Sequence, residues 1–388
     1  MVDFALTTAQ QDIVDHTRAV ARRCLAPRAT EYDRSAQFPA DNFTDLAEAG
    51  LLGLLIPTAR GGLGADMVTY ALAVAELAEA CGSTALIFAM HCGATRLLSA
   101  DPGPAAAKAL RGVLDDGTLI AWGFSEPGTG GNILNPQLRA HRVEAGGFTL
   151  EGTKAFCTGA GHVGHYLINT HSGETEFRRS QSMFLLPAET PGLSVKETWD
   201  ALGMRANCAN TVLLDCEVPE EQCVGGHGGG MPLLAHALPA LVLGLAAASL
   251  GVARAANAFA ASHVTRRVHT NTGANLAAYQ GVRFEIAEMA TTLHTAYLTL
   301  LHACATADTD PLEALPAMNM AKYVCNTAAI SVADTAMQVT GGHGYVRSNP
   351  LERHYRDARA GAVMGANLGV LRDMIGKAVL GMDPRDPL

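Results

Sequence analysis

The chain has 388 residues, of which 48% are hydrophobic and 17% charged, and its formal net charge is −9. This length allows two or three domains with sizeable cores, and the composition is that of a globular rather than a disordered protein. The acidic balance disfavours binding to nucleic-acid phosphates or to an anionic membrane surface. It still allows an anionic ligand that is held by a few local arginines.

The nine cysteines are scattered singly, without a C-x-x-C pair. Their spacing and odd number favour reduced thiols in a cytoplasmic protein over a disulfide scaffold or a zinc site, so we expect no metal. The N-terminus, MVDFALTTAQQD, lacks the basic start and apolar run of a signal peptide. The most apolar segment, 238–253, is shorter than the roughly 20 residues that span a bilayer. We expect it to be a buried core helix.

Helical spacing dominates the chain up to about residue 115, beginning at Thr7, where TTAQ fits a capping box. From Thr118 the helical spacing of apolar residues gives way to short strand-like runs, such as TLIAWGF, GFTLEG, SMFLLP and TVLLDCEVP. These runs predict a small barrel or sandwich. Helical stretches at 238–264, 276–306, 314–338 and 359–379 then predict an antiparallel bundle. The fold expected is α+β, mainly α: an N-terminal helical domain (1–117), a central β-barrel-like domain (118–230) and a C-terminal four-helix bundle (231–388).

Three segments carry candidate chemistry. AWGFSEPGTGGN (121–132) enters a Gly-rich turn whose amides and Ser125 suit a polar heterocycle or a phosphate, although a plain loop explains it equally well. In EGTKAFCTGAGHVGHY (151–166), Phe156 could lie against a planar ring and Thr158 could bond its edge, but alone this is better read as a strand entering a loop. In DTAMQVTGGHGYVRSNPLERHYRDARAGAVMGANL (334–368), paired glycines leave bare backbone where a ligand can approach.

Together with GLLGLLIPTARGGLG (50–64) and LGMRANCANTVLLDCEVP (202–219), these segments resemble the acyl-CoA dehydrogenase family in order and spacing. The resemblance implies FAD bound at the subunit interfaces of a homotetramer or homodimer. It implies that Ser125 and Gly130 belong to the flavin loop, with Ser125 bonding the pyrimidine. Phe156 would pack on the flavin ring and Thr158 would lie near N5.

The resemblance also implies that the adenosine diphosphate of FAD is contacted, in part from a neighbouring subunit, by Gln280, Gln338, Gly341 and Gly342. Asn367 occupies the place of a family Thr that holds the pyrophosphate. His343, between the glycines, would contact cofactor or partner subunit. The family's Arg-x-x-Phe-Gly turn is not clearly recognisable in this sequence. The equivalent of its Arg is Arg266, Arg267 or neither.

The sequence departs from the family where the catalytic Glu is usual. Gly365 stands there and offers only its backbone amide. Some relatives carry the base on the first bundle helix, but the matching stretch here, 240–243, is wholly apolar, and Val242 replaces a family Arg near the thioester. His91 is a candidate substitute base, although a lone His among apolar residues is more often a core group. Arg96 would bind a substrate anion or pair with an acidic side chain elsewhere.

We therefore expect a flavin-dependent oxidoreductase that acts on a small acyl thioester, with CoA as the expected carrier. An O2-using oxygenase or oxidase of specialised metabolism is favoured, because oxygenases of this fold include a CoA-ester dioxygenase of bacterial tropone biosynthesis that lacks the Glu. The alternatives are a conventional α,β-dehydrogenase with a relocated base and a redox-neutral elimination such as desulfination. A binding protein that has lost catalysis is the least favoured.

Overall fold

A computed structural model describes residues 5–129, 136–144, 146–172, 181–311 and 313–383. The N-terminal part is helical. Its helices are α1 (Thr8–Val20), a π-helical turn (Ala21–Leu25), α2 (Ala26–Ser35), α3 (Ala40–Glu48), α4 (Met67–Ala80), α5 (Gly82–Ser99) and α6 (Pro104–Asp116). The predicted capping box is confirmed, because the side chains of Thr7 and Gln10 each bond the backbone N–H of the other.

The middle part consists of two four-stranded sheets. The first has the order β1 (Ile120–Gly123), β4 (His165–His171), β5 (Gln181–Pro187), β8 (Cys223–Val224), and its β1–β4 pair is parallel. The second has the order β2 (Ala140–Arg142), β3 (Phe148–Cys157), β7 (Asn210–Val218), β6 (Leu193–Lys196), and is antiparallel. Apolar residues of both sheets, including Phe148, Tyr166 and Phe184, form one core, so this part is a sandwich.

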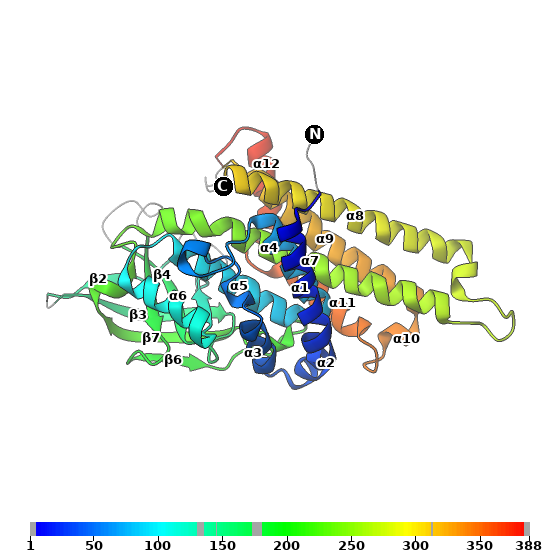
Figure 1. Cartoon of the computed structure of the whole chain (residues 1–388), viewed down its shortest axis with the longest axis horizontal. Helices are drawn as coiled ribbons and strands as arrows, with labels where there is room; N and C mark the ends of the chain where they lie inside the picture. The colour runs from blue at the N-terminus through cyan, green and yellow to red at the C-terminus, as the bar shows by residue number, and fades with distance from the viewer. Residues whose placement is uncertain (1–4, 130–135, 145, 173–180, 312, 384–388) are drawn as a thin grey trace.

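The C-terminal part is a helix bundle that extends away from the sheets, to the right in Figure 1. It contains α7 (Gly230–Arg266), α8 (Gln280–Thr309), α9 (Leu315–Thr340), α10 (Gly342–Tyr345), α11 (Leu351–Val363) and α12 (Leu368–Val379). Short 3₁₀ helices connect elements at Leu51–Gly53, Thr58–Arg60, Arg205–Asn207, Glu220–Gln222 and Leu276–Ala278. The predicted architecture of helices, sheets and bundle is confirmed.

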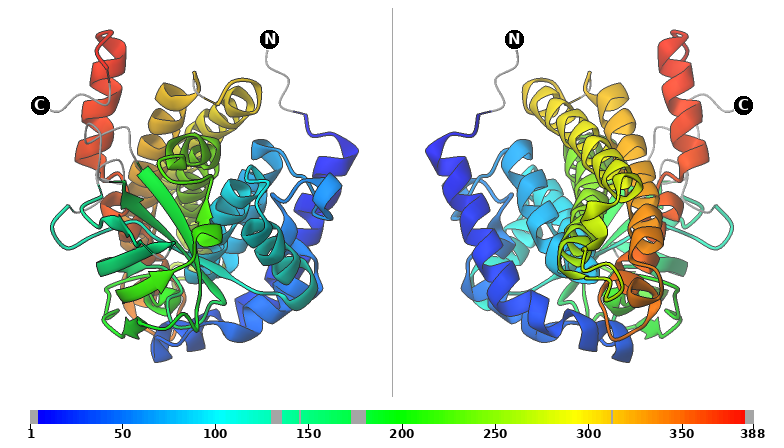
Figure 2. Two further views of the ribbon diagram at one scale, coloured as in Figure 1. Left: turned by 90° about the vertical axis from the view of Figure 1, so that its left-hand side faces the viewer. Right: turned by 90° about the vertical axis from the view of Figure 1, so that its right-hand side faces the viewer.

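The predicted helix over 359–379 is wrong, because the chain breaks it in two. α11 ends at Val363, and Asn367 begins α12 as an N-cap whose side-chain oxygen accepts from the N–H groups of Gly369 and Val370. Gly365 and Asn367 are residue types that favour such an interruption. Figure 2 shows that α12 consequently stands out from the rest of the molecule.

α7 is the helix on which the other helices converge, and it packs against α4, α5, α8, α9 and α11. By length and composition it could cross a membrane, but 72% of its most apolar window is buried inside the structure. Two of its glycines allow α4 to approach closely: a Cβ on Gly244 would lie 2.2 Å from the Tyr70 hydroxyl, and one on Gly251 would lie 2.2 Å from the Ala75 carbonyl oxygen. The segment predicted as a buried core helix is therefore part of the central helix of the molecule.

The close approach of α4 and α7 predicts a steric cost. Gly251→Val should lower the free energy of unfolding by about 1–3 kcal/mol, because its side chain must displace α4 backbone rather than a flexible side chain. Gly281→Val is the matched control, since Gly281 is also helical and has no atom within 4 Å of its Cβ position. Chemical denaturation measures both, and equal stability of the two variants would contradict the packing described.

Candidate functional site

Phe156 lies at an irregularity of β3, where the register with β7 shifts between Lys154 and Cys157. Its φ angle is +54°, which a residue with a side chain rarely adopts. Its side chain is also 69% exposed, although it is a large aromatic group. Strained backbone that holds an apolar ring in solvent is typical of a ligand-binding position. Thr158 follows at the end of the strand and is buried.

A buried ion pair brings Ser125 next to this strand. The Lys154 ammonium lies 2.6 Å from Glu126, and both side chains are almost fully buried. Glu126 also accepts from the N–H groups of Gln137 and Leu138, at 2.6 and 3.1 Å. Burial lowers the pKa of Lys154, and the carboxylate of Glu126 acts against this.

The turn that follows β1 is also bonded to β3 through the main chain, because the Ala155 N–H donates to the Ser125 carbonyl at 2.7 Å. Ser125 and Phe156 are therefore neighbours, on segments that are separated in sequence. Gly130, which was also predicted to belong to this loop, lies outside the described residues.

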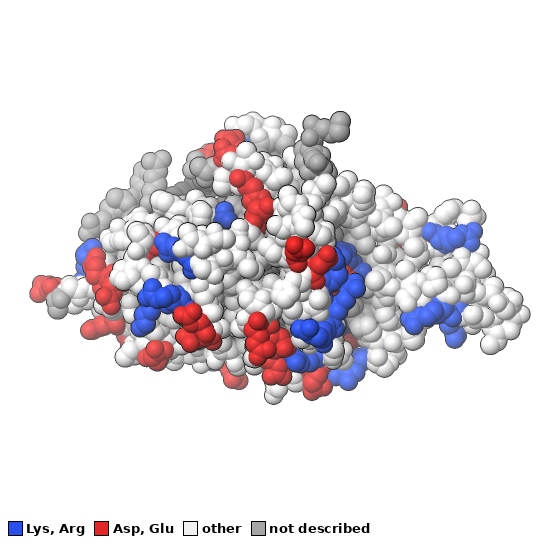
Figure 3. All heavy atoms as spheres, viewed as in Figure 1, with Lys and Arg blue, Asp and Glu red and all other residues white. Residues whose placement is uncertain are grey.

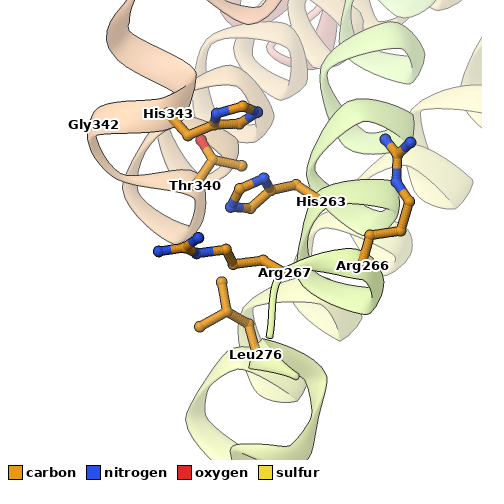
Figure 4. Close-up of a pocket in the computed structure, with 7 residues that line it drawn as sticks. All are labelled: His263, Arg266, Arg267, Leu276, Thr340, Gly342 and His343. Atoms are coloured by element: carbon orange, nitrogen blue, oxygen red, sulfur yellow. The ribbon is translucent and has the colours of Figure 1, made fainter. Parts of the chain in front are cut away.

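A second group of predicted residues lies at the opposite end of the bundle, around a hollow of about 650 Å³. Figure 4 shows this hollow, which is lined by His263, Arg266, Arg267, Leu276, Thr340, Gly342 and His343. The rings of His263 and His343 are stacked with centroids 4.5 Å apart. Burial lowers the pKa of His263, and the neighbouring His343 and arginines lower it further. The hollow is thus rich in nitrogen donors and positive charge.

The orientation of the two arginines distinguishes them. In Figure 4 the guanidinium of Arg267 points to the side of α7 where His263 and His343 lie, whereas Arg266 points away. Arg266 instead donates to the Ser262 carbonyl of its own helix, at 3.2 Å. Arg267 is therefore the better placed of the two to meet a ligand in the hollow.

The other predicted residues of this group are exposed on the same end of the bundle. Gln338 lies on the last turn of α9, and Gln280 is the first residue of α8. Gly341 and Gly342 form the turn between α9 and α10, and nothing lies within 4 Å of the Cβ position of either. This turn leaves open backbone next to the positive hollow.

A third group is the turn between α11 and α12. Gly365 is exposed there, and a Cβ placed on it would meet nothing within 4 Å. Asn367 uses its side-chain oxygen to cap α12, at 2.9 and 3.0 Å from the N–H groups of Gly369 and Val370. Lys322 of α9 holds the backbone of this turn, because its ammonium donates to the carbonyls of Met364 and Ala366.

The sheet residues and the hollow lie toward opposite ends of α7. Trp122 of β1 and Leu241, in the first half of α7, both lie against Gly93, whereas the last turn of α7 carries His263 and Arg266. The 22 residues from Leu241 to His263 span about 33 Å. Figure 1 shows the strands on the left of the molecule and α10 on its right-hand side, and basic side chains are visible on that side in Figure 3. One chain therefore does not bring the two groups together.

His91 occupies a different environment from the one that a base requires. The side chain is fully buried, its Nδ1 accepts from the Ile120 N–H at 3.2 Å, and its Nε2 lies 3.1 Å from the Leu52 carbonyl oxygen. Burial lowers the pKa of His91 to about 4, so the neutral ring is stable at neutral pH. Both ring nitrogens of His91 interact with backbone groups. This geometry contradicts the hypothesis that His91 is a base and favours the alternative, a core histidine whose polar atoms have hydrogen-bond partners.

Arg96 donates from its Nε to the His236 carbonyl, at 2.9 Å. That carbonyl lies on α7, three residues before Pro239. Burial lowers the pKa of Arg96. The bond explains where the side chain points, and a role for Arg96 in binding a substrate anion stays a prediction.

The stretch of α7 in which some relatives carry the base is apolar in three dimensions as well. Leu241 packs so closely on α5 that a Cβ on Gly93 would lie 2.8 Å from it and 3.2 Å from the Trp122 ring. Leu241 is 7% exposed and Trp122 is 1% exposed. This stretch contributes packing and no ionisable group.

Sequence reasoning did not assign a role to the Lys154–Glu126 pair or to His263. A signal for Lys154 exists, because Phe148, Leu150 and Lys154 share one face of β3 by the two-residue period, and the first two are buried. His263 precedes Arg267 by four residues, which places them on one face of a helix. Lys322 gave no comparable signal, since its partners are main-chain carbonyls far along the chain.

Family models for three acyl-CoA dehydrogenase domains match the chain. The N-terminal domain matches residues 7–108, the middle domain 121–216 and the C-terminal domain 228–380. The chain is 31% identical to the mitochondrial short-chain specific acyl-CoA dehydrogenase of Mus musculus over 350 residues, 88% of this chain and 83% of the relative. It is 30% identical to the cyclohex-1-ene-1-carbonyl-CoA dehydrogenase of Geobacter metallireducens, over 97% of this chain and 99% of the relative.

Among solved structures, the butyryl-CoA dehydrogenase of Megasphaera elsdenii superposes with a TM-score of 0.92 at 27% identity, covering 98% of this chain and 100% of that one. The three domain matches, the relatives and this superposition agree over nearly the whole chain. The chain belongs to the acyl-CoA dehydrogenase family.

Proposed function

We propose that this protein is an FAD-dependent enzyme that acts on a small acyl thioester of CoA and uses O2 as its oxidant, as an oxygenase or oxidase of specialised metabolism. The observation that carries the proposal is the turn between α11 and α12. Gly365 is exposed there, without a side chain, where the resemblance expects the catalytic Glu. We place the enzyme in the cytoplasm and expect it to act as a homotetramer or homodimer.

The two ligand-binding groups fit the two ends of the family's cofactor, FAD. An exposed aromatic ring beside polar main chain, at Phe156 and Ser125, suits the flavin ring. The hollow with Arg267, two histidines and the bare backbone of Gly342 suits the adenosine diphosphate end. Bound flavin supplies two-electron redox chemistry and, when reduced, reactivity toward O2.

The distance between these groups supports a shared site. Because about 33 Å of α7 separates Leu241, beside β1, from His263 at the hollow, we infer that one dinucleotide contacts both groups only if they come from two chains. In such an assembly Phe156 of one protomer would hold the flavin ring, and the hollow of a partner would hold the other end. This is the basis for the oligomer proposed above.

The packing of Leu241 supports a small acyl group. The region that the resemblance assigns to the acyl chain is where α5, α7 and β1 meet. There Gly93, Leu241 and Trp122 are in close contact, without room for a further Cβ on Gly93. An extended acyl chain would have to displace Trp122, which is almost fully buried.

The choice of oxidant follows from the proton that a dehydrogenase must remove. A positioned base contributes roughly 10²–10⁴ in rate. Gly365 has no carboxylate, residues 240–243 are apolar, and both nitrogens of His91 are engaged. In the oxygenase case, oxygen atoms from O2 enter the product. An oxidase, which takes two electrons and two protons from the substrate and reduces O2 to hydrogen peroxide, needs a proton acceptor as a dehydrogenase does, so the missing carboxylate favours the oxygenase case.

The second candidate is a conventional α,β-dehydrogenase whose base lies elsewhere in the sequence. It is favoured by the relatives, since short-chain acyl-CoA dehydrogenases are 30–31% identical to this chain over most of its length. An oxygenase differs from this candidate because it forms no enoyl thioester without O2, and an oxidase differs from it because O2 rapidly re-oxidises its reduced flavin.

Phe156 gives a prediction for the cofactor site. Phe156→Gly should raise the free energy of unfolding of the apoprotein by about 1 kcal/mol, because glycine tolerates the left-handed backbone, and should weaken FAD binding through loss of the ring contact. Ala36→Gly is the matched control, since Ala36 has a φ of +55° away from this strand, and it should gain stability with FAD affinity unchanged. Denaturation and titration of apoprotein with FAD measure both effects. Unchanged FAD affinity in Phe156→Gly would remove Phe156 from the flavin site.

Labelled oxygen tests the reaction. The purified FAD-loaded protein, as isolated and after photoreduction, is mixed with a panel of short acyl-CoA thioesters under ¹⁸O₂ and, in parallel, without oxygen. We expect label in the acyl product or in hydrogen peroxide, and no enoyl-CoA in the anaerobic samples. Enoyl-CoA formed anaerobically, with bleaching of the flavin absorbance, would exclude the oxygenase, and reduced flavin that then reacts only slowly with O2 would establish the dehydrogenase.

A further inference from the structure

Lys322 is a buried cation without an acidic partner among the described residues. It lies on α9 and is 1% exposed. Its ammonium donates to two main-chain carbonyls, those of Met364 at 3.2 Å and Ala366 at 2.9 Å. Burial lowers the pKa of Lys322 to about 8, and burial is the one cause of the shift. Below pH 8 the ammonium is charged and its burial costs stability, so stability should rise as the pH increases from 8 toward the ordinary value for lysine.

The two acceptors bracket Gly365. Lys322 bonds the carbonyls of residues 364 and 366 from the buried side of the turn. Gly365 between them faces solvent and has open space around its Cβ position. Glycine has the greatest backbone freedom of any residue, so a turn built around it is ordered only by what holds its neighbours. Lys322 bonds the carbonyl of each neighbour, in addition to the bond that the Met364 N–H donates to the Ala360 carbonyl at 3.1 Å.

The bonds belong to a larger set that ties α11 and its turn to α9. One turn further along α9, Asn326 donates to the Gly361 carbonyl at 2.6 Å and accepts from Ser249 of α7 at 2.8 Å. A Cβ on Gly361 would lie 2.5 Å from the Ser249 hydroxyl, so α11 approaches this set closely. Lys322 and Asn326 thus hold the main chain from the end of α11 to Ala366, up to the cap residue Asn367.

We propose that Lys322 is a positioning residue that orders the turn 364–367, so that the amide of Gly365 and the side chain of Asn367 are presented to the flavin cofactor in one conformation. The inference rests on the proposed cofactor site. Lys322 does not act as a base, because its side chain is buried beneath the turn and both bonds point to backbone. The buried charge of Lys322 lowers stability, and the turn that it orders carries no catalytic side chain. Such a cost is expected where function requires the turn to be rigid.

Lys322→Met tests this, because methionine retains most of the volume and removes the donors. In the apoprotein, hydrogen–deuterium exchange of the 364–367 amides should become faster. The affinity for FAD should fall by about tenfold, as expected for lost hydrogen bonds from a charged donor. The thermal midpoint should stay the same or rise, since a buried charge is removed. Lys322→Arg, which keeps charge and donors, should recover part of the FAD affinity.

The control is Lys377→Met. Lys377 is also largely buried, lies on α12, and is ion-paired with Asp373 at 2.7 Å, away from the turn. This variant should leave exchange at 364–367 and FAD affinity unchanged. Unchanged exchange in Lys322→Met would overturn the proposal, and so would faster exchange with unchanged FAD affinity. A wild-type apoprotein that does not bind FAD would instead refute the proposed function, and the exchange data would still report on the ordering of the turn.

Discussion

The close packing of α7 against its neighbours is the constraint on which the other features depend. Gly244 and Gly251 allow α4 to approach its main chain, and Leu241 fills the space beside Gly93. A helix that is buried on this scale must be apolar, because ionisable groups among such neighbours would be desolvated. The same packing therefore builds the core, limits the room for an acyl group and leaves residues 240–243 without a base.

The length of α7 also separates the halves of the cofactor site. Phe156 is held in a strained, exposed conformation beside the sheets, where the Lys154–Glu126 pair fixes the adjoining turn. Arg267 and His343 lie near the far end of α7, around a hollow with positive charge. In the oligomer that we propose, a site divided in this way depends on a second chain. Its assembly, flavin binding and any reaction are then linked, because loss of the oligomer would leave each half incomplete.

Much of the fold could be predicted from the sequence, since capping residues, helical spacing and alternation each have a local cause. The strand β4 was missed because HYLINTH is buried on both faces and shows no alternation. The break at 364–367 was missed because apolar residues on both sides continue a helical pattern. For the site, ligand-binding motifs depend on residue types and were recognisable. For His91 the sequence favoured a core role over a base but did not reveal the partners of its ring, because Leu52 and Ile120 are brought to it by tertiary packing.

The central claim is that the flavin site is retained and that the missing carboxylate at Gly365 is what prevents dehydrogenation. Gly365→Glu tests it, because the structure has open space for the side chain. FAD-loaded wild type and variant are mixed with short acyl-CoA thioesters without oxygen, with Gly365→Gln as the isosteric control. We predict that only the Glu variant bleaches its flavin and forms enoyl-CoA, faster than the control by about 10²–10⁴-fold. Anaerobic bleaching by the wild type at the rate of the Glu variant would contradict the claim.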